Sequence, residues 1–282
     1  MKSTLKLVIC AVLPAAWKSS EKFVEKFIHE LFVQSGCVAG VDTSVILSYD
    51  KEGRSEWKIF DILQREFPKL VLLPSNKAQY VSASLYLSSF KVALNMCADL
   101  VLEIDCSGAH DADQIPSLIS RAVPTLQNDP NSLVCVLSTR FASGGEDHFP
   151  KNRVLLSRLA TLFSHSFLML GKTGREFTDM SSGFEVFSGA LLRRMFELRE
   201  FKNWISYWWG PLYLFQTEAR SFAFWIAQKE KVIVFESPIV FGDKFDRKLA
   251  PLTIGYLTRA FISGLLLIWE GIGIRRRMKR LP

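Results

Sequence analysis

The sequence lacks the cysteine and histidine patterns that hold metals or build disulfide frameworks. Its cysteines are odd in number and widely spaced, mostly in apolar runs, with no C-x-x-C pair: Cys10, Cys37, Cys97, Cys106 and Cys135. This usage is typical of buried free thiols in a reducing cytosol. The four histidines show no metal-ligand spacing, and neither a G-x-S-x-G nor a phosphate-loop motif is present. Zinc-site, hydrolase and kinase functions therefore lack support.

Long uncharged apolar segments are scarce at both ends of the chain. Residues 252–274 are apolar but contain Arg259 and Glu270, which leaves an uncharged run of ten residues, too short to predict a membrane span. Near the amino terminus, lysines precede the apolar run 7–13 as in a signal peptide, but the run is short and Ser and Glu residues follow at once. We interpret that run as a buried first strand.

The body of the chain has almost no excess of basic over acidic residues. The formal net charge is +7, but five of the basic residues lie in the last eight positions, 275–282, which contain no acid. Removing those five charges leaves +2, so the body has no excess of basic residues with which to bind nucleic acid. We predict no nucleic-acid partner, and an anionic membrane surface as a partner of the tail.

The remaining composition is that of a folded protein, with 49% hydrophobic and 22% charged residues. Strand patterns alternate with helical spacing, which predicts a mainly parallel sheet with helices on both faces. The expected strands are 5–13, 45–47, 70–73, 99–104, 133–137 and 232–235, and the expected helices are 20–33, 56–67, 81–93 and 115–123. No linker divides the chain, so we predict one domain over 1–250 and an appended C-terminal amphipathic helix with its basic tail over 251–282.

Eight short motifs follow one another along most of the chain. They are Leu13-Pro14-Ala15, the segment 76–85, Leu102-Glu103-Ile104-Asp105, Ser138-Thr139-Arg140-Phe141 with Gly144-Gly145, Asn152-Arg153 with Ser157-Arg158, the segment 179–184, Gln216-Thr217-Glu218, and Glu236-Ser237-Pro238-Ile239. In order and type they resemble the motifs of family-two glycosyltransferases, in particular the polyprenyl-phosphate sugar transferases of the dolichol-phosphate mannosyltransferase type. The resemblance implies a GT-A (Rossmann-like) α/β fold, a UDP- or GDP-linked sugar donor and a polyprenyl (dolichyl-type) phosphate acceptor.

The resemblance also implies an enzyme, a hexosyltransferase that acts with inversion at the cytoplasmic face of a membrane. A lipid-phosphate oxygen attacks the anomeric carbon while a nucleoside diphosphate leaves. Because the phosphate is already anionic, no strong general base is needed, and electrostatic stabilisation carries the catalysis. The implied catalytic residues are Asp105, Arg140 and Arg153.

The acceptor positions of the family are matched by Arg140, Arg153 and Ser157. Arg153 and Ser157 are four residues apart, so one helical face presents a guanidinium and a hydroxyl to one phosphate. The alternative is that both arginines are surface residues that pair with acids such as Glu146 or Asp147.

The metal-binding positions match only in part. The family reads D-A-D-x-Q where this chain has Asp105-Cys106-Ser107-Gly108-Ala109, so Asp105 is the expected metal ligand and Ser107 a weaker one. Magnesium or manganese held by one carboxylate and substrate oxygens fits such a set. Asp111 and Asp113 favour a helix cap over a metal site. Glu103 lies on the same strand face as Asp105, either as a second carboxylate or as a structural ion-pair partner.

Other positions are carried over from the resemblance. Pro14, Ala15, Asp50 and Gln79, with Asp105 and Ser107, are expected to bind the donor. Asp179, Gln216 and Glu218 are expected to contact the sugar or the acceptor. Asp179 also fits a turn or helix cap, and the aromatic stretch at 204–215 either lines a lipid groove or fills the core.

The C-terminal segment allows two interpretations. An interfacial helix with Trp269 at the headgroup level, followed by the basic cluster, predicts a cytoplasmic protein that is peripheral at the membrane. The alternative is a core helix with a solvated tail. Because the second carboxylate and several glycines of the family are replaced, a non-catalytic relative that binds lipid phosphate or a protein partner is the alternative function.

Overall fold

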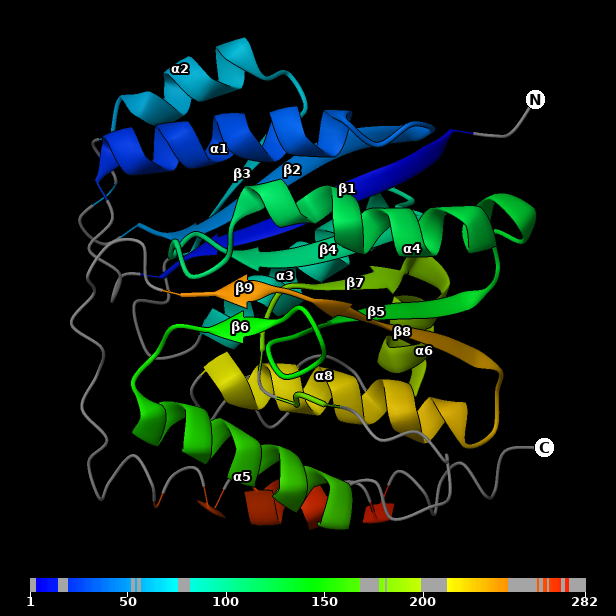
Figure 1. The fold of residues 1–282 in the computed structure, drawn as a ribbon. Helices are drawn as coiled ribbons and strands as arrows, with labels where there is room; N and C mark the ends of the chain where they lie inside the picture. Colours follow the sequence, from blue (N-terminus) through cyan, green and yellow to red (C-terminus); the bar gives the residue numbers. More distant parts are fainter. Residues whose placement is uncertain are drawn as a thin grey trace.

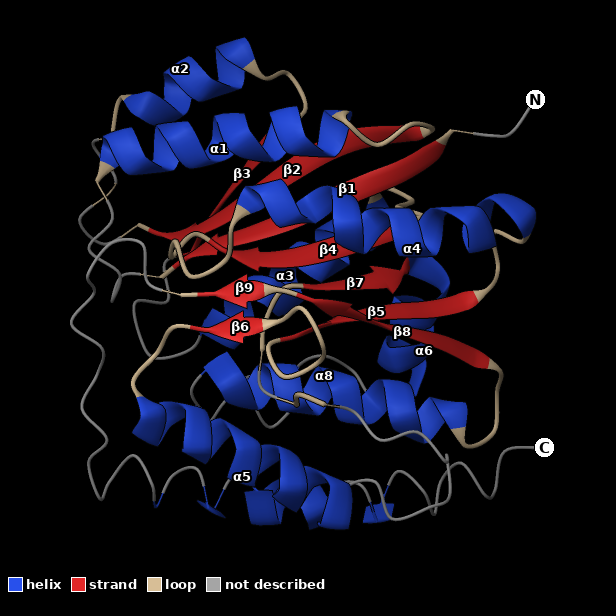
Figure 2. Cartoon of the chain, viewed as in Figure 1, coloured by secondary structure: helices blue, strands red, loops and turns tan. Residues whose placement is uncertain are grey.

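Figures 1 and 2 present the computed structural model of the chain. The structure describes residues 4–14, 20–51, 54, 57–75, 82–167, 178–180, 182–198 and 212–242, and near the C-terminus 258, 261–262, 264–269 and 272–273.

A seven-stranded sheet forms the centre of the molecule, in the order β3-β2-β1-β4-β7-β5-β8. The strands are β1 (Leu5–Leu13), β2 (Val41–Asp50), β3 (Leu70–Ser75), β4 (Leu100–Asp105), β5 (Leu133–Thr139), β7 (Glu185–Ser188) and β8 (Val232–Pro238). Every neighbouring pair is parallel except the two that involve β7, which runs antiparallel to β4 and β5. The predicted mainly parallel sheet is therefore confirmed.

The strands form where the sequence has continuous apolar runs, because parallel strands are buried on both faces. β1 is the clearest case, since eight of its nine residues are buried. It pairs with β2 on one side and β4 on the other, so that Ile9 lies beside Val45 and Leu102. The prediction of a buried first strand is confirmed.

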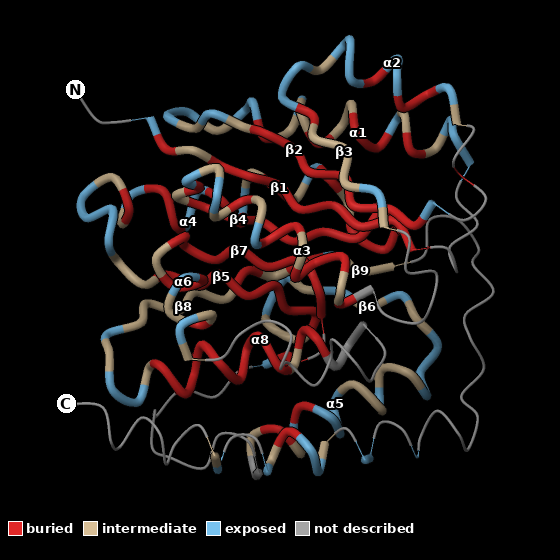
Figure 3. The backbone as a smooth tube through the Cα atoms, turned by 180° about the vertical axis from the view of Figure 1, so that it is seen from behind, coloured by how far each residue is buried: buried red, intermediate tan, exposed pale blue. Residues whose placement is uncertain are grey.

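Helices cover both faces of the sheet, as Figure 2 shows. One core packs the sheet against α1 (Glu21–Gly36), α2 (Ile59–Glu66) and α4 (Ile115–Asn128); the other packs it against α3 (Ser82–Asn95), α6 (Gly189–Leu198) and α8 (Leu212–Ala227). A further helix, α5 (Lys151–Phe167), lies beyond α8 in the views of Figures 1 and 3. The predicted mainly parallel sheet with helices on both faces is confirmed.

Local sequence explains where the helices begin. The Ser20 hydroxyl caps α1 by accepting from the Phe23 amide at 3.2 Å, and an acid follows in the first turn. Val24, Phe27 and Leu31 then recur at helical spacing and are buried against the sheet. A short 3-10 turn, η1 (Ala112–Gln114), leads into α4.

Two β features were not predicted from the sequence. β7 has only four residues, one of them the buried Glu185, so it lacks the apolar run that identified the other strands. A separate ribbon pairs β6 (Glu146–Asp147) with β9 (Val240–Phe241). Both features bear on function, since β7 separates β4 from β5 and the ribbon carries Asp147.

The junction of β7 and α6 requires glycine, and a substitution tests this packing. A Cβ atom at Gly189 would lie 2.0 Å from the main-chain oxygen of Ala98. We expect Gly189→Ala to lower the free energy of unfolding by about 2 kcal/mol, measured by urea denaturation. Gly36→Ala is the matched control, because a Cβ atom there meets no atom within 4 Å. Equal stability of the two variants would contradict the packing.

Part of the predicted C-terminal helix is described. Residues 258, 261–262, 264–269 and 272–273 are helical, whereas the basic tail at 275–282 and the expected domain boundary at residue 250 lie outside the described residues. Within the described part of the chain, no helix has both the length and the apolar character needed to cross a membrane.

Candidate active site

The parallel strands β1, β2, β4 and β5 place their carboxyl ends at one edge of the sheet, where open α/β sheets bind ligands (Figure 1). Several predicted site residues lie at or just after these strand ends and are buried: Pro14, Asp50, Asp105, Ser107 and Arg140. Ala15 and Gln79 lie outside the described residues. The strand ends therefore bring together the described members of the predicted donor set and Arg140.

The loop after β4 holds Asp105 against Ser107. Oδ1 of Asp105 accepts hydrogen bonds from both the amide and the hydroxyl of Ser107, and the Ser107 hydroxyl accepts from the Ala109 amide at 3.3 Å. Gly108 follows with φ +80°, a conformation that favours glycine. A hydroxyl thus stands beside Asp105 where the family has its second carboxylate.

Arg140 is buried in a network of acids. Its Nε and Nη2 donate to the two carboxylate oxygens of Asp179 at 2.6 and 2.9 Å, and its Nη1 donates to Asp147 at 3.2 Å. The rings of Phe141 and Phe241 each lie 5.0 Å from the guanidinium carbon. Arg140 is therefore not a surface residue, although its expected pairing with Asp147 is present. Glu146 contacts His148 instead.

The two glycines after Arg140 shape its loop. Gly144 has φ +86°, which favours glycine. A Cβ atom at Gly145 would lie 2.7 Å from the main-chain oxygen of Arg140 and 2.8 Å from that of Thr139. The loop therefore folds back tightly onto the backbone that carries Arg140.

Helix α5 lies close to Arg140 through aromatic and backbone contacts. The guanidinium of Arg158 lies 4.9 Å from the Phe141 ring, so Phe141 contacts both Arg158 and Arg140. Arg153 and Ser157 are half-buried in the first two turns. Thr161 accepts from the Met180 amide at 3.1 Å, which ties α5 to the segment that carries Asp179.

The predicted site residue Gln216 lies against Gly183, together with His110. A Cβ atom there would lie 2.3 Å from the amide nitrogen of Gln216 and 3.4 Å from Nε2 of His110. His110 is 3% exposed, and its ring centroid lies 5.2 Å from that of Phe184. Glu218, on the same helix as Gln216, is fully buried.

The chain has recognisable relatives, although it matches no family model. It is 25% identical over 240 residues to the undecaprenyl-phosphate mannosyltransferase of Micrococcus luteus, a match that covers 83% of this chain and 86% of that protein. The predicted resemblance to glycosyltransferases is confirmed.

Solved structures align at lower similarity. The 4-diphosphocytidyl-2C-methyl-D-erythritol synthase of Anaerococcus prevotii has a TM-score of 0.46 and 13% identity, and the match covers 93% of this chain and 96% of that one. TarS of S. aureus also has a TM-score of 0.46, with 12% identity and coverages of 83% and 60%.

Arg220 is a site residue that the sequence analysis missed. It is fully buried on α8 and pairs with Glu185. It also donates to the main-chain oxygens of Asp179, Ser182 and Ser138. Arg220 thus fixes the segment that holds Asp179. Its position four residues after Gln216 on α8 did not indicate this role in the sequence.

Arg54 is a second missed residue, at the edge where the donor is expected. It is 4% exposed, and its Nη2 donates to the main-chain oxygen of Pro14 at 2.9 Å. Burial lowers the pKa of Arg54, and the charge of Asp50 acts in the opposite direction. A cation therefore lies between the ends of β1 and β2, where Asp50 was the charged residue that the resemblance implied.

Glu103, expected either as a second carboxylate of the metal site or as an ion-pair partner, is fully buried opposite Glu185 on the neighbouring strand. Among the described residues, neither of its carboxylate oxygens has a hydrogen-bond partner. Burial first, and then the charge of Glu185, raises the pKa of Glu103 well above its usual value. Burial also raises the pKa of Glu185 to about 7, against the charge of Arg220.

This burial predicts a pH-dependent effect of removing the Glu103 charge. Folded Glu103 stays protonated after the unfolded chain has ionised, so stability is lost as the pH rises above the ordinary carboxyl pKa. We expect Glu103→Gln to match the natural protein near pH 4 and to exceed its free energy of unfolding by about 1 kcal/mol or more at pH 8. Urea denaturation at both pH values measures this difference. A variant that is less stable at pH 8 would contradict it.

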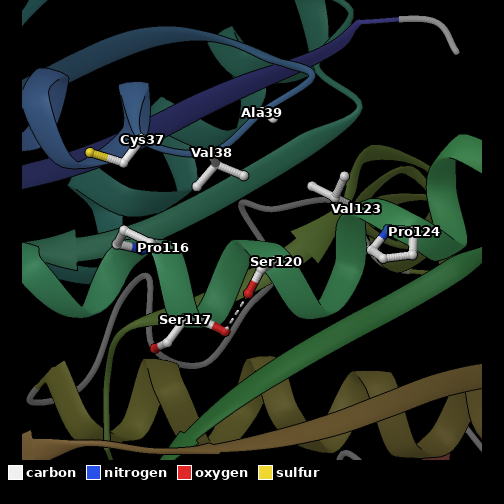
Figure 4. A pocket seen from close by; sticks show the side chains of 8 residues that line it. All are labelled: Cys37, Val38, Ala39, Pro116, Ser117, Ser120, Val123 and Pro124. Atoms are coloured by element: carbon white, nitrogen blue, oxygen red, sulfur yellow. Dashed lines mark hydrogen bonds between the residues drawn. The ribbon is translucent and has the colours of Figure 1, made fainter.

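A separate cavity lies between the end of α1 and α4. It has a volume of about 540 Å³ and is lined by Cys37, Val38 and residues of α4 that include Pro116 and Ser117, as Figure 4 shows. None of the predicted site residues lines it. The cavity is therefore separate from the candidate active site.

Proposed function

We propose that the chain is a glycosyltransferase that moves a sugar from a UDP- or GDP-linked donor to a polyprenyl phosphate at the cytoplasmic membrane face. The observation that carries the proposal is its likeness to an undecaprenyl-phosphate mannosyltransferase over 83% of the chain. The eight motifs in order support the same reaction. The cluster of polar residues at the carboxyl edge of the sheet provides a place for the chemistry.

The proposed reaction is a single displacement with inversion. A phosphate oxygen of the lipid forms a bond to the anomeric carbon, and the bond from that carbon to the donor diphosphate breaks. The diphosphate leaves with the electron pair, and no proton has to move. The chain therefore needs to orient two anions and to offset their charges, which fits a site with arginines.

On the acceptor side, Arg153 and Ser157 are the proposed phosphate contacts. Arg140 has Nε and Nη2 committed to Asp179, so a phosphate would approach through Nη1 and compete with Asp147. Asp179 is thus the partner that orients Arg140. Gln216, near His110 and Gly183, is proposed to contact the sugar, and Glu218 stays an expectation of the resemblance.

On the donor side, Asp105 and Ser107 fit a magnesium or manganese ion only if the donor and water supply most of its ligands. The described residues include no group of three or more His, Cys, Asp or Glu side chains placed to bind a metal. One carboxylate with a neighbouring hydroxyl is a sufficient protein contribution for such an ion. The ion would neutralise the leaving diphosphate, while Asp50 and Pro14 contact the nucleoside.

Nucleotide binding tests the donor site. We expect UDP or GDP to bind in calorimetry in the presence of magnesium or manganese, and Asp105→Asn to weaken that binding by about tenfold. Asp113→Asn, an exposed acid in the same region, is the control. Failure of both nucleotides to bind a folded sample would contradict the transferase and support the non-catalytic alternative.

A further inference from the structure

The residues that lead into β7 carry backbone strain beside the candidate site. We call residues 178–180 and 182–184 the Asp179 segment. Phe184, its last residue, is fully buried and has φ +75°, a left-handed conformation that is unfavourable for a bulky side chain. Such strain persists only where the surrounding structure fixes the conformation, and it concentrates at functional sites. The contacts that hold the Asp179 segment therefore bear on function.

Arg220 holds the Asp179 segment from α8. Its Nη1 donates to the main-chain oxygen of Asp179, and its Nη2 donates to the main-chain oxygen of Ser182 at 2.7 Å and to the hydroxyl of Ser182 at 2.9 Å. Nη2 also donates to the main-chain oxygen of Ser138 at 3.2 Å, near the end of β5. Nε donates to Glu185. Both terminal nitrogens thus contact the segment or the strand end, so Arg220 does more than offset the charge of Glu185.

The Asp179 segment in turn orients Arg140. The Ser182 amide donates to Oδ1 of Asp179 at 3.2 Å, so the main chain that Arg220 holds also supports the Asp179 carboxylate. That carboxylate accepts from Nε and Nη2 of Arg140. The Ser182 hydroxyl donates to the main-chain oxygen of Ser138 at 2.6 Å, two residues before Arg140. Two buried arginines therefore contact one segment, Arg220 through its main chain and Arg140 through its carboxylate.

We propose that Arg220 is a positioning residue of the acceptor site. It fixes the Asp179 segment, so that Asp179 occupies Nε and Nη2 of Arg140 and Nη1 is the nitrogen that meets the acceptor phosphate. The inference deepens the proposed function and rests on it for the identity of the phosphate. The step from Arg220 to Arg140 rests on the hydrogen bonds of the structure.

The contacts of Arg220 require a guanidinium. Its planar fork of N–H donors reaches the carboxylate of Glu185 through Nε and the main-chain oxygens of the Asp179 segment through the terminal nitrogens. A lysine ammonium is a compact point charge on a flexible stem and cannot span both sets of acceptors. Arg220→Lys therefore keeps a charge beside Glu185 but loses hydrogen bonds to the segment.

Arginine side-chain NMR tests the step from Arg220 to Arg140 without any sugar transfer. The readout is hydrogen exchange at Nε of Arg140, whose signal is assigned by its loss in Arg140→Lys. In the natural protein this hydrogen is buried and bonded to Asp179 at 2.6 Å, so its exchange is slow. We expect Arg220→Lys to accelerate the exchange by about tenfold or more, because the Asp179 segment then opens more often.

Arg194→Lys is the matched control for Arg220→Lys. Arg194 also donates through Nε to a glutamate, Glu230, at 2.6 Å. Glu230 lies shortly before β8, at the edge of the sheet opposite to the candidate site. Arg194→Lys should therefore leave the exchange at Arg140 unchanged.

Ser182→Ala is a second variant that keeps Arg220 itself, so the proposal stays testable if Arg220→Lys fails to fold. It removes the hydroxyl that Arg220 and the Ser138 main chain share but leaves the main chain of the segment in place. We expect exchange at Arg140 to be about threefold faster. Thermal unfolding shows which variants are folded.

Substrate dependence separates positioning from a general structural role. We expect Arg220→Lys to lower kcat/KM for polyprenyl phosphate by about tenfold while the affinity for UDP or GDP in calorimetry stays unchanged. A residue that only stabilised the core would not act on one substrate alone.

Two outcomes would overturn the proposal. One is exchange at Arg140 that is as slow in folded Arg220→Lys and Ser182→Ala as in the natural protein. The other is an equal loss of nucleotide affinity and of kcat/KM for polyprenyl phosphate in Arg220→Lys. Faster exchange in the variants of a protein that transfers no sugar would contradict only the proposed function, whereas transfer at the natural rate by Arg220→Lys would contradict only the positioning role.

Discussion

Replacing Arg153 with alanine is expected to reduce sugar transfer by about 100-fold or more while leaving the fold intact. Arg153 is half-buried in the first turn of α5, where its guanidinium is the proposed contact of the acceptor phosphate. A charged contact that forms around the reacting phosphate contributes mainly to the rate. Initial rates with a saturating nucleotide-sugar and varied polyprenyl phosphate measure the loss.

Two further variants make this result specific. Arg153→Lys keeps the charge but not the two-pronged geometry, so partial recovery is expected. Arg121→Ala removes an exposed arginine of α4 on the opposite side of the sheet and should leave the rate unchanged. Full activity of Arg153→Ala would show that Arg153 does not bind the acceptor phosphate and would contradict an acceptor site on α5.

Asp179→Asn is expected to have the largest effect on stability. Asp179 is fully buried, accepts two hydrogen bonds from the Arg140 guanidinium, and accepts two more from the amides of Ser182 at 3.2 Å and Arg140 at 3.3 Å. The variant leaves the guanidinium buried without its main counter-charge, which costs about 3 kcal/mol in the free energy of unfolding. Urea denaturation measures this cost.

Asp147→Asn is the matched control for Asp179, because both carboxylates contact the same arginine. Asp147 makes one contact with Arg140, at 3.2 Å, compared with the paired contacts of Asp179. A loss of about 1 kcal/mol or less is expected. Equal losses in the two variants would show that Asp179 does not hold Arg140 in the way described.

The sheet was largely predictable because parallel strands are buried on both faces and appear in the sequence as continuous apolar runs. β1, β4 and β5 show this directly. β7 escaped prediction because it is short and contains Glu185, whose buried charge is offset by Arg220, 35 residues away. A partner at that separation leaves no local signal.

The sequence predicted which residues lie at the carboxyl edge of the sheet better than it predicted how their side chains pair. Arg140 was expected to bind the acceptor phosphate and Asp179 to contact the sugar or the acceptor, and the sequence did not indicate that the two side chains form one ion pair. The leucines of α5 have the spacing of an ordinary core-facing stripe, although the structure exposes them. Periodicity identifies a face of a helix, but only the neighbouring elements decide whether that face lies inward.

The most direct test of the central claim is a transfer assay with the purified protein. Radiolabelled GDP- and UDP-sugars are incubated with vesicles that contain undecaprenyl phosphate and with magnesium or manganese, and the lipid fraction is extracted. The account predicts label in the lipid from one donor class, dependent on the polyprenyl phosphate and abolished by Arg153→Ala. A folded protein that binds nucleotide and vesicles but transfers no label from either donor class would contradict it.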